Sequence, residues 1–316
     1  MIAGLHTSGS TILNGSGQTV VLHGVNHAST EYSCPGGGFN DGHLTQADLT
    51  VLKTWHSNAV RIPLNESCWL NIGGPPFNDG AYQTALRNYV NLIVANGMIP
   101  ILDLHWTAPG NELARGQAPM PDAAHSTTFW QQVAAAYAST GSGDTSVNSS
   151  VVFDLFNEPH DITWGCWLNG GCTTTGHGGA SGPAVGMASL YATVRATGAK
   201  NVIIIAGTGW AHRCDVANWV AGIRSIAGGV SNVACSCHWY GGASTSDVDL
   251  PGVVAAGFPV VLSEGDMTNV QQIFDLHQSV TLWNYGTAAG PVMLTDWSGG
   301  TNSYGSSYRS WLQSKY

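Results

Sequence analysis

Two glutamates, Glu158 and Glu264, each follow an apolar run that has the length of a buried strand. The first run, residues 151–156, leads into an Asn-Glu-Pro motif, and the second, residues 259–262, leads into Ser-Glu. Buried strands of this kind belong to covered parallel sheets, and a polar residue at their end lies at the edge of the sheet. If the fold brings the two carboxyl groups together, they could serve a hydrolase that works with two carboxyl groups.

Eight short apolar runs are expected to form strands, with helical patterns between them. The expected strands are residues 20–25, 59–62, 99–104, 151–156, 202–206, 233–237, 259–262 and 292–295. The expected helices are residues 44–56, 80–96, 123–139, 183–197, 215–226, 250–256, 270–285 and 303–314. This alternation predicts an α/β protein with a (β/α)8 TIM barrel. A doubly wound open sheet is the alternative, but the GxGxxG motif that it usually carries after its first strand is absent.

The chain is expected to be one catalytic barrel domain that spans residues 1–316. A barrel of this kind takes ~250 residues, which leaves room for insertions. Two connections are long: residues 105–122 after the third expected strand, and residues 160–182 after the fourth. Long loops in a compact domain are usually functional, and the loops that follow the strands form the active face of a barrel.

Polar or aromatic residues lie at the ends of seven of the eight expected strands. Besides the two glutamates they are Asn26, His27, Glu31, Tyr32, Arg61, Asp103, His105, Trp106, Asn157, His238, Trp239, Tyr240, Asp296 and Trp297. Taken singly, Arg61 could be a structural ion-pair partner, and His105 or His238 could be a buried histidine with satisfied hydrogen bonds. Asp103 and Asp154 are interpreted as interior acids bonded to their neighbours. Because the strand ends of a barrel meet at one face, the whole set predicts a site there.

Charge and hydropathy exclude two classes of partner. Only 9% of the residues are charged, and the net charge of −9 with ten Lys and Arg in no basic cluster argues against nucleic acid. No apolar run reaches 18 residues, so we expect no membrane span.

So few charged residues are typical of a secreted enzyme. Residues 1–10 lack a basic start followed by an apolar core, and the low charge favours a chain that begins after a removed signal peptide.

Seven cysteines lie in loops without paired CxxC motifs, which disfavours a zinc site and favours disulfides. We expect the pairs Cys34–Cys68 and Cys166–Cys172, and Cys214 with either Cys235 or Cys237, which leaves one thiol over. Barrel metallohydrolases usually carry His-x-His on the first strand, whereas here His23 and His27 are four residues apart. We therefore expect neither a metal nor another cofactor.

In these features the chain resembles glycoside hydrolase family 5, the cellulase family of retaining barrel enzymes. The resemblance rests on Asn-Glu-Pro after the fourth expected strand combined with Ser-Glu at the seventh, and it extends from the second strand to the eighth. The family's recurring set is an Arg, a His, an Asn-Glu pair, a His-x-Tyr, a Glu and a Trp. It maps in order onto Arg61, His105, Asn157, Glu158, His238, Tyr240, Glu264 and Trp297. The insertion after the fourth strand and the segment 31–34 are not general features of the family.

The resemblance implies that Glu158 is the acid/base and Glu264 the nucleophile of a double displacement, with the carboxyl groups ~5–5.5 Å apart. An arginine and a tyrosine beside Glu264 would favour its charged form. The negative charge of Glu264 would in turn raise the pKa of Glu158, which must be protonated. In this scheme Asn157 binds the sugar 2-hydroxyl and His238 positions Glu158, while Trp297 offers an apolar face to the sugar ring.

The expected substrate is a polysaccharide or oligosaccharide, with endo cleavage of β-1,4-glucan as the leading interpretation. Mannan, β-1,3-glucan and side-chain furanosides are the alternatives, and a barrel that binds glycan without cleaving it is a further one. Candidate sugar platforms are Trp69, Trp106, Trp164, Trp167, Trp210 and Trp239. We expect a secreted monomer.

Overall fold

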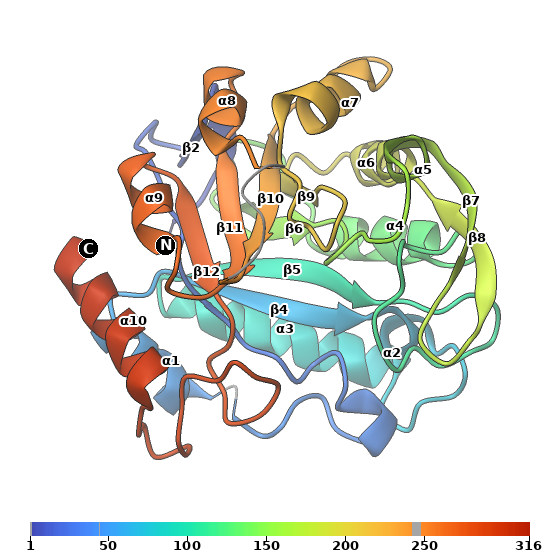
Figure 1. Ribbon diagram of the computed structural model, residues 1–316. Helices are drawn as coiled ribbons and strands as arrows, with labels where there is room; N and C mark the ends of the chain where they lie inside the picture. The colour runs from blue at the N-terminus through green and yellow to red at the C-terminus, as the bar shows by residue number, and fades with distance from the viewer. Residues whose placement is uncertain (1, 44, 242–247) are drawn as a thin grey trace.

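The structure is a computed structural model that describes residues 2–43, 45–241 and 248–316. Its centre is a closed barrel of parallel strands in the order β3-β4-β5-β6-β9-β10-β11-β12 (Figure 1). The strands are β3 (His23–Asn26), β4 (Ala59–Asn65), β5 (Ile99–Trp106), β6 (Val152–Asp154), β9 (Ile203–Ala206), β10 (Val233–Trp239), β11 (Val260–Gly265) and β12 (Ser279–Leu282). The predicted (β/α)8 barrel is confirmed.

Helices surround the barrel and follow the expected order (Figure 1). They are α1 (Gln46–Thr54), α3 (Asp79–Ala95), α4 (Ser126–Ala136), α6 (Met187–Ala196), α7 (Ala221–Ser225), α8 (Leu250–Ala255), α9 (Val270–Asp275) and α10 (Ser303–Lys315). Short additional helices are α2 (Glu66–Leu70), α5 (Trp164–Asn169), the 3-10 turns Cys34–Gly36 and Val147–Ser150, and a π-helical turn Val216–Val220. A capping box formed by Thr45 and Asp48 sets the start of α1. None of the described helices is both long and apolar enough to cross a bilayer.

The eighth strand was predicted at the wrong place. It lies at Ser279–Leu282, inside the segment expected to be helical, and it pairs with β11 and β3 to close the barrel. The helix ends early because His277 adopts a left-handed φ of 55°. The Ser-Val-Thr-Leu sequence that follows has two adjacent β-branched residues, Val280 and Thr281, which favours a strand. Residues 292–295 instead belong to the connection after β12, where Leu294 bridges Thr301.

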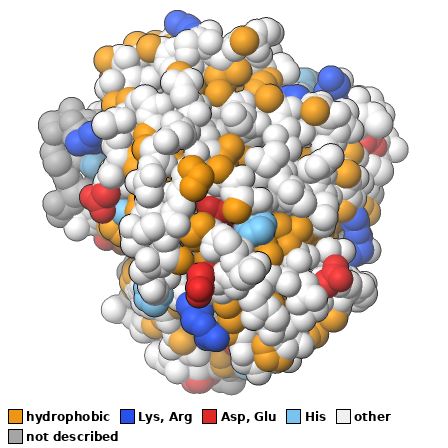
Figure 2. Space-filling model, turned by 90° about the vertical axis from the view of Figure 1, so that its right-hand side faces the viewer, with side chains coloured by type: hydrophobic (Ala, Val, Ile, Leu, Met, Phe, Trp, Pro, Cys, Tyr) orange, Lys and Arg blue, Asp and Glu red, His pale blue; other side chains and the backbone are white. Residues whose placement is uncertain are grey.

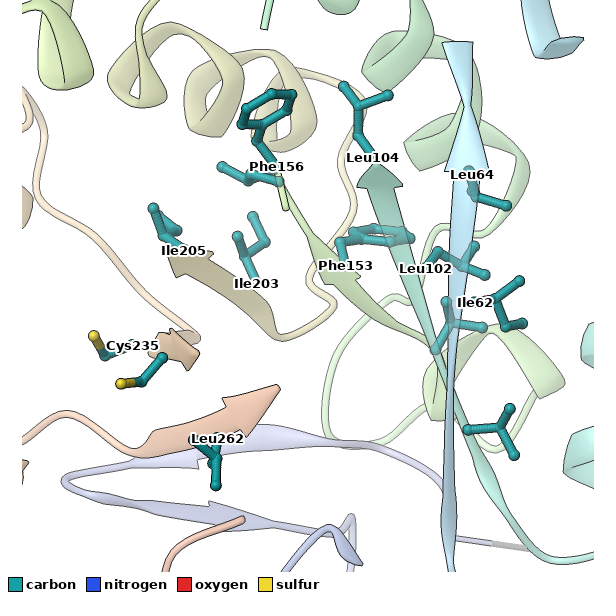
Figure 3. Packing of buried hydrophobic residues seen from close by; sticks show 14 of the residues in the cluster. Ile62, Leu64, Leu102, Leu104, Phe153, Phe156, Ile203, Ile205, Cys235 and Leu262 are labelled. Carbon is teal, nitrogen blue, oxygen red and sulfur yellow. The ribbon is translucent and has the colours of Figure 1, made fainter. Parts of the chain in front are cut away.

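Side chains alternate along the strands and form two apolar layers. The outer layer lies between barrel and helices and includes Ile62, Leu64, Leu102, Phe153, Ile205 and Leu262 (Figure 3). The inner layer includes Ala59, Ile101, Val152, Ile204, Ala234 and Val261. Because successive strand residues point to opposite faces, continuous apolar runs supply both layers.

A small hairpin contributes to the inner layer from the N-terminal segment. It consists of β1 (His6–Ser8) and β2 (Thr11–Leu13), and its Ile12 belongs to the same buried cluster as the barrel interior. Leu5 and Leu22, which flank the hairpin, join that cluster. The N-terminal segment therefore packs against the apolar half of the barrel.

The long connection after β6 contains regular structure. After α5 it forms an antiparallel hairpin of β7 (Gly170–Thr175) and β8 (Ser181–Val185), which extends beside the barrel in Figure 1. The hairpin bonds to the other long connection, because Val185 N–H donates to Pro121 O at 2.9 Å and Ala123 N–H donates to Pro183 O at 2.8 Å. The two long loops were thus correctly located, but the second is not irregular.

Three disulfides join neighbouring loops and elements. They are Cys34–Cys68, Cys166–Cys172 and Cys214–Cys235, so the structure decides the partner of Cys214 that the sequence left open. All seven cysteines lie in the described part of the chain, and there Cys237 alone is unpaired and buried. The odd thiol is therefore a core residue of β10.

Candidate active site

Arg61 is the centre of the polar half of the barrel. It is fully buried on β4, and its guanidinium donates to Glu264 Oε1 at 2.6 Å, to Asp154 Oδ2 at 2.9 Å and to Asn157 Oδ1 at 2.9 Å. Asp103 Oδ2 lies 3.1 Å from the same group. Burial disfavours the charge of Arg61, but the three surrounding carboxylates outweigh it and raise the pKa. Arg61 is thus both an ion-pair partner and a holder of site residues.

Glu264, near the end of β11, is held by two donors. Arg61 contacts its Oε1, and the Tyr240 hydroxyl donates to its Oε2 at 2.9 Å. Glu264 is 4% exposed, and its strand register places it directly opposite His238 on β10. Each of the two carboxylate oxygens thus accepts a hydrogen bond from a different side chain, one on β4 and one directly after β10. The sequence-based expectation that Arg61 and Tyr240 flank Glu264 is therefore met in space.

Glu158 lies in the turn after β6 and faces Glu264. His238 Nδ1 lies 2.8 Å from Glu158 Oε1 and 3.6 Å from Glu264 Oε2. One oxygen of each carboxyl group and His238 Nδ1 all lie within 4.8 Å of one another. The two acids therefore share one small space. These three side chains are also those that could hold a metal ion, since carboxylate and imidazole are ordinary ligands of divalent metals.

The protonation states follow mainly from burial. Burial raises the pKa of Glu158, while Gln117 and the positive charge of Arg61 act in the opposite direction. From the sequence we expect the charge of Glu264 to raise the pKa of Glu158. The direction agrees, but the cause is burial of the Glu158 carboxyl group and not that charge. Burial also lowers the pKa of His238 to about 3, so the ring is neutral near pH 7. A neutral ring can bond to Glu158 in either of its protonation states.

His105 and Asn157 lie side by side in the buried part of the site. His105 Nδ1 lies 2.6 Å from Asp103 Oδ2, and its Nε2 lies 3.4 Å from the Asn157 amide nitrogen. Burial lowers the pKa of His105 to about 4, so this ring is also neutral. Asp103 and Asp154 bond to His105 and Arg61, as expected for interior acids. Asn157 is thereby fixed from two sides.

Trp297 is not the tryptophan at the end of strand eight. That position belongs to Trp283, which directly follows β12 and stacks on His105 with ring centroids 5.6 Å apart and planes at 14°. The helix expected over residues 270–285 includes Trp283, because the sequence pattern does not reveal β12. Trp297 comes later in the same connection and stacks instead on His43, with centroids 3.9 Å apart. The alternating 279–283 sequence was the signal that could have identified Trp283.

The six tryptophans that are candidate sugar platforms differ in how exposed their side chains are. Trp69, Trp167 and Trp239 are buried and belong to the core. Trp210 is 49% exposed and stacks on His160, two residues from Glu158, with centroids 3.5 Å apart. The remaining two, Trp106 and Trp164, are partly buried. One face of the Trp210 ring thus packs on His160, and the other face is open to a ligand.

The site opens on the face towards which the strands run. Figure 2 shows this face, and near its centre an acidic and a histidine side chain are visible among hydrophobic ones. Gln117, from the loop after β5, also acts on Glu158, whose pKa it lowers. No motif pointed to this residue, since a single glutamine in a loop carries no sequence signal.

Known proteins resemble this chain in sequence over much of its length. The profile of the family described as Cellulase (glycosyl hydrolase family 5) matches residues 13–314. An endoglucanase from Microbulbifer sp. (strain ALW1) is 21% identical over 51% of this chain. A manganese-dependent endoglucanase from Phanerodontia chrysosporium is 25% identical over 69% of it. The matches span 27% and 53%, respectively, of these two curated relatives.

Solved structures share the fold. A β-glucanase from Saccharophagus degradans in complex with cellotetraose has a TM-score of 0.72 at 18% identity, covering 100% of this chain and 95% of that one. The catalytic domain of a Streptomyces sp. SirexAA-E mannanase has a TM-score of 0.67 at 18% identity, with 96% and 89% covered. The family match covers nearly the whole barrel together with its paired glutamates. The chain therefore belongs to glycosyl hydrolase family 5, a family of O-glycosyl hydrolases.

Proposed function

We propose that this chain is a retaining endo-acting glycoside hydrolase that cleaves β-1,4-glucan. The observation that carries the proposal is the approach of Glu158 and Glu264, whose nearest ligand oxygens lie within 4.8 Å. Retaining enzymes hold their carboxyl groups ~5–5.5 Å apart, whereas inverting enzymes need ~6.5–9.5 Å to admit a water molecule. The spacing supports direct attack by one carboxylate on the sugar.

In the first step, a Glu264 oxygen bonds to the anomeric carbon while the bond from that carbon to the leaving oxygen breaks. Glu158 gives its proton to the leaving oxygen. In the second step, Glu158 takes a proton from water, whose oxygen displaces Glu264 and restores both groups. Asn157, fixed by Arg61 and His105, would bond the sugar 2-hydroxyl.

The environments of the two acids support this division of roles. Glu264 contacts a guanidinium and a phenol hydroxyl, which suit a charged nucleophile. Glu158 bonds to a neutral imidazole, and burial raises its pKa, which suits an acid that must carry a proton. Because their surroundings differ, the two carboxyl groups are suited to different roles in the reaction.

The choice of glucan rests on the relatives and on one exposed aromatic. Two curated relatives are endoglucanases, and a structural relative was solved with cellotetraose. The exposed face of Trp210, close to Glu158, could stack on a sugar on the leaving-group side. Mannan is the second candidate, because a mannanase shares the fold.

Two measurements test this proposal. A panel of β-1,4-glucan, mannan, β-1,3-glucan and arabinofuranoside-bearing polymers, followed by reducing-sugar detection, should give its highest rate on β-1,4-glucan with internal cleavage. Proton NMR of the first product should show the β-anomer. An early α-anomer would contradict the mechanism, and a faster rate on another polymer would contradict the substrate.

The proposed reaction draws its acid and nucleophile from the protein and uses no metal. One relative is named manganese dependent, and Glu158, His238 and Glu264 could bind a divalent ion. A metal there would compete with the sugar for both carboxyl groups. We expect activity to survive exhaustive chelation, and a loss that Mn²⁺ alone restores would contradict this.

We also propose a secreted monomer in which residues 1–316 form one catalytic domain. Three disulfides suit an oxidising compartment, and both long connections pack on the same barrel. Size-exclusion chromatography with light scattering should give the 33.0 kDa of one chain. A dimer would contradict the monomer, and detection of the protein only inside cells would contradict secretion.

A further inference from the structure

We propose that the side chains of Glu66, Ser126 and Asp122 form a latch that holds the β5–α4 connection (residues 107–125) and the β7–β8 hairpin in place while Glu66 carries a proton. These side chains lie outside the candidate active site and take no part in the proposed reaction. The inference therefore goes beyond the proposed function and does not rest on it. It assigns a pH-sensitive conformational role to two buried acids.

Two buried carboxyl groups meet at one serine hydroxyl. Glu66 is the first residue of α2, Ser126 is the first residue of α4, and Asp122 lies in the β5–α4 connection. Glu66 and Ser126 are 0% exposed, and Asp122 is 4% exposed. Ser126 Oγ lies 2.6 Å from Glu66 Oε2 and 3.4 Å from Asp122 Oδ2. A single hydroxyl hydrogen thus lies between two acids that are shielded from water.

No cation balances two carboxylates at this place. In the described part of the chain, neither Glu66 nor Asp122 forms an ion pair with Lys, Arg or His. Two negative charges in one buried space are poorly solvated and repel each other, so one of the two groups keeps its proton. Burial and the charge of Asp122 accordingly raise the pKa of Glu66 well above its ordinary value of 4.5.

The hydrogen bonds show how a proton on Glu66 joins the three side chains. Asp122 Oδ1 already accepts from the N–H groups of Ala124 and His125, at 2.9 and 2.8 Å. Glu66 Oε1 is buried and has no hydrogen-bond partner among the described residues. With a proton on Oε2, Glu66 donates to Ser126 Oγ, and the serine hydrogen is then free to point to Asp122 Oδ2. Without that proton, the serine can serve only one of the two carboxylates.

The latch connects α2 to the segment that carries the hairpin. Asp122 forms an antiparallel bridge with Ala184 in β8. The hydrogen bonds of Pro121 and Ala123 to the hairpin, described for the fold, flank Asp122 on both sides. A second negative charge on Glu66 would repel Asp122 and with it the backbone that pairs with β8. Ionisation of Glu66 should therefore weaken the attachment of the hairpin.

Other titratable groups surround the latch but do not contact Glu66. They are Arg61 on β4, Asp103 and His105 on β5, Asp79, Tyr82, Arg87 and Tyr89 on α3, His125 before α4, Glu112 and Arg115 in the β5–α4 connection, and His177 in the hairpin turn. Within the described residues, none of them forms a hydrogen bond or an ion pair with Glu66. They are unchanged in the variants below, which alter the two acids of the latch alone.

One proton makes the opening of the latch depend on pH. In the open state Glu66 ionises near its ordinary value of 4.5, whereas in the closed state its pKa is higher. The proton therefore costs nothing below pH 4.5, and opening becomes more favourable as pH rises from there towards the closed-state pKa. For a single proton, the equilibrium constant for opening grows by up to about tenfold per pH unit in this window.

The test compares amide hydrogen exchange in the wild type and in Glu66→Gln at matched pH. Glutamine has nearly the shape of glutamic acid, stays neutral, and can donate its amide N–H to Ser126 Oγ. The reporter amides are those of Ala123 and Val185, which bond the connection to the hairpin. Near pH 5 their exchange should agree within about threefold between the two proteins. Near pH 8 it should be about tenfold or more faster in the wild type.

A reference amide separates local opening from overall stability. Val20 N–H donates to Ile12 O in the N-terminal segment, which packs against the apolar half of the barrel. Its exchange should be the same in both proteins at both pH values, because opening of the latch leaves this segment in place. If Val20 accelerates as much as Ala123 and Val185, Glu66 affects only overall stability, and the latch is refuted.

Asp122→Asn tests the same pair from its other side. The asparagine oxygen can still accept from Ala124 and His125, and its amide can donate to an ionised Glu66. This variant should also slow exchange of the reporter amides near pH 8, and combining it with Glu66→Gln should change the rate by less than about threefold more. Either single variant is sufficient for the test if the other does not fold.

Glu112→Gln is the matched control, since it neutralises an exposed acid in the same connection. It should exchange like the wild type at both pH values. Equal reporter exchange near pH 8 in the wild type, Glu66→Gln and Asp122→Asn would overturn the inference. A difference of the same size near pH 5 and pH 8 would overturn it as well, because the effect would then not depend on a proton.

Discussion

The two ends of the barrel interior are built from the same strands but are lined by opposite kinds of side chain. On three neighbouring strands, an apolar interior residue is followed two positions later by a charged one. The pairs are Ala59 and Arg61, Ile101 and Asp103, and Val152 and Asp154. Residues two apart on a strand point to the same face, so each pair lines the same interior. The apolar end packs against the N-terminal segment, and the polar end carries the paired glutamates.

The difference shows how the fold divides its tasks. The apolar end gains stability by removing aliphatic side chains from water, at roughly 25 cal/mol per Å². The polar end buries Arg61 with Asp103, Asp154 and Glu264, and removing such charges from water is unfavourable unless they are paired. Chemistry is therefore concentrated where the barrel is least stabilised by burial. Substitutions at the two ends should separate activity from stability.

The largest effect is expected from removal of either glutamate at the polar end. Glu158→Ala and Glu264→Ala should each lower kcat on the natural polymer by on the order of 10³-fold or more, because a proton donor or the nucleophile is lost. The unfolding midpoint should stay close to that of the wild type. The exposed Glu112→Ala is the control and should keep full activity. Substantial hydrolysis by either site variant would remove the two-carboxylate mechanism.

Next in size is the loss of the cation that balances the polar end. Arg61→Leu leaves Asp103 and Asp154 without their shared partner and should cost about 3–5 kcal/mol in urea unfolding at pH 7.

The loss of unfolding free energy in Arg61→Leu should be smaller at low pH. Burial holds the pKa of Asp103 (about 7) and of Asp154 above the ordinary value of 3.8, and loss of the cation raises both further. An acid whose pKa is higher in the folded than in the unfolded state does not destabilise the fold below its unfolded-state pKa. The free energy of unfolding then falls as the pH rises through the folded-state pKa. Arg224→Leu, at an exposed arginine, should change stability by less than about 1 kcal/mol. A deficit independent of pH would argue against this electrostatic account.

At the apolar end, Ile204→Ala should show the opposite behaviour. It removes a fully buried side chain and should cost about 2–5 kcal/mol of unfolding free energy. Activity measured well below the melting temperature should stay within about twofold, since the site lies at the other end. Val216→Ala, at a side chain 39% exposed, is the control. A large loss of kcat in folded Ile204→Ala would show that the two ends are coupled.

The smallest effect concerns the pH profile of the wild type. Because burial raises the pKa of Glu158 and the group acts when protonated, the basic limb of kcat/KM should lie above the ordinary value of 4.5. Activity should fall as pH rises through that limb. In Glu158→Gln, assayed with an activated aryl glycoside, the limb should disappear. Its persistence would assign the limb to another group.

Much of this comparison could be predicted from the sequence. The strand of Glu158 and that of Glu264 are continuous apolar runs, and a polar residue after such a run has few places to lie except the edge of a sheet. The eighth strand was predicted at the wrong place because the polar–apolar alternation of Ser279–Leu282 is only four residues long and directly follows a helical pattern. The error carried Trp297 into the place of Trp283, since the residue was assigned by its position after a strand.

By itself, the sequence determined the barrel and the placement of the two glutamates after its strands, because apolar periodicity and motif order are local properties of the chain. The neighbours expected around Glu264 came from the resemblance to the family, and the two disulfides that the structure contains as expected were not determined by any pattern. Only the tertiary structure decided which tryptophan stacks on His105, which cysteine pairs with Cys214, and that the β7–β8 hairpin bonds to the connection after β5. These contacts join loops that are distant along the chain. Their geometry depends on how the hairpin and the connections pack on the barrel, and no spacing in the sequence records that packing.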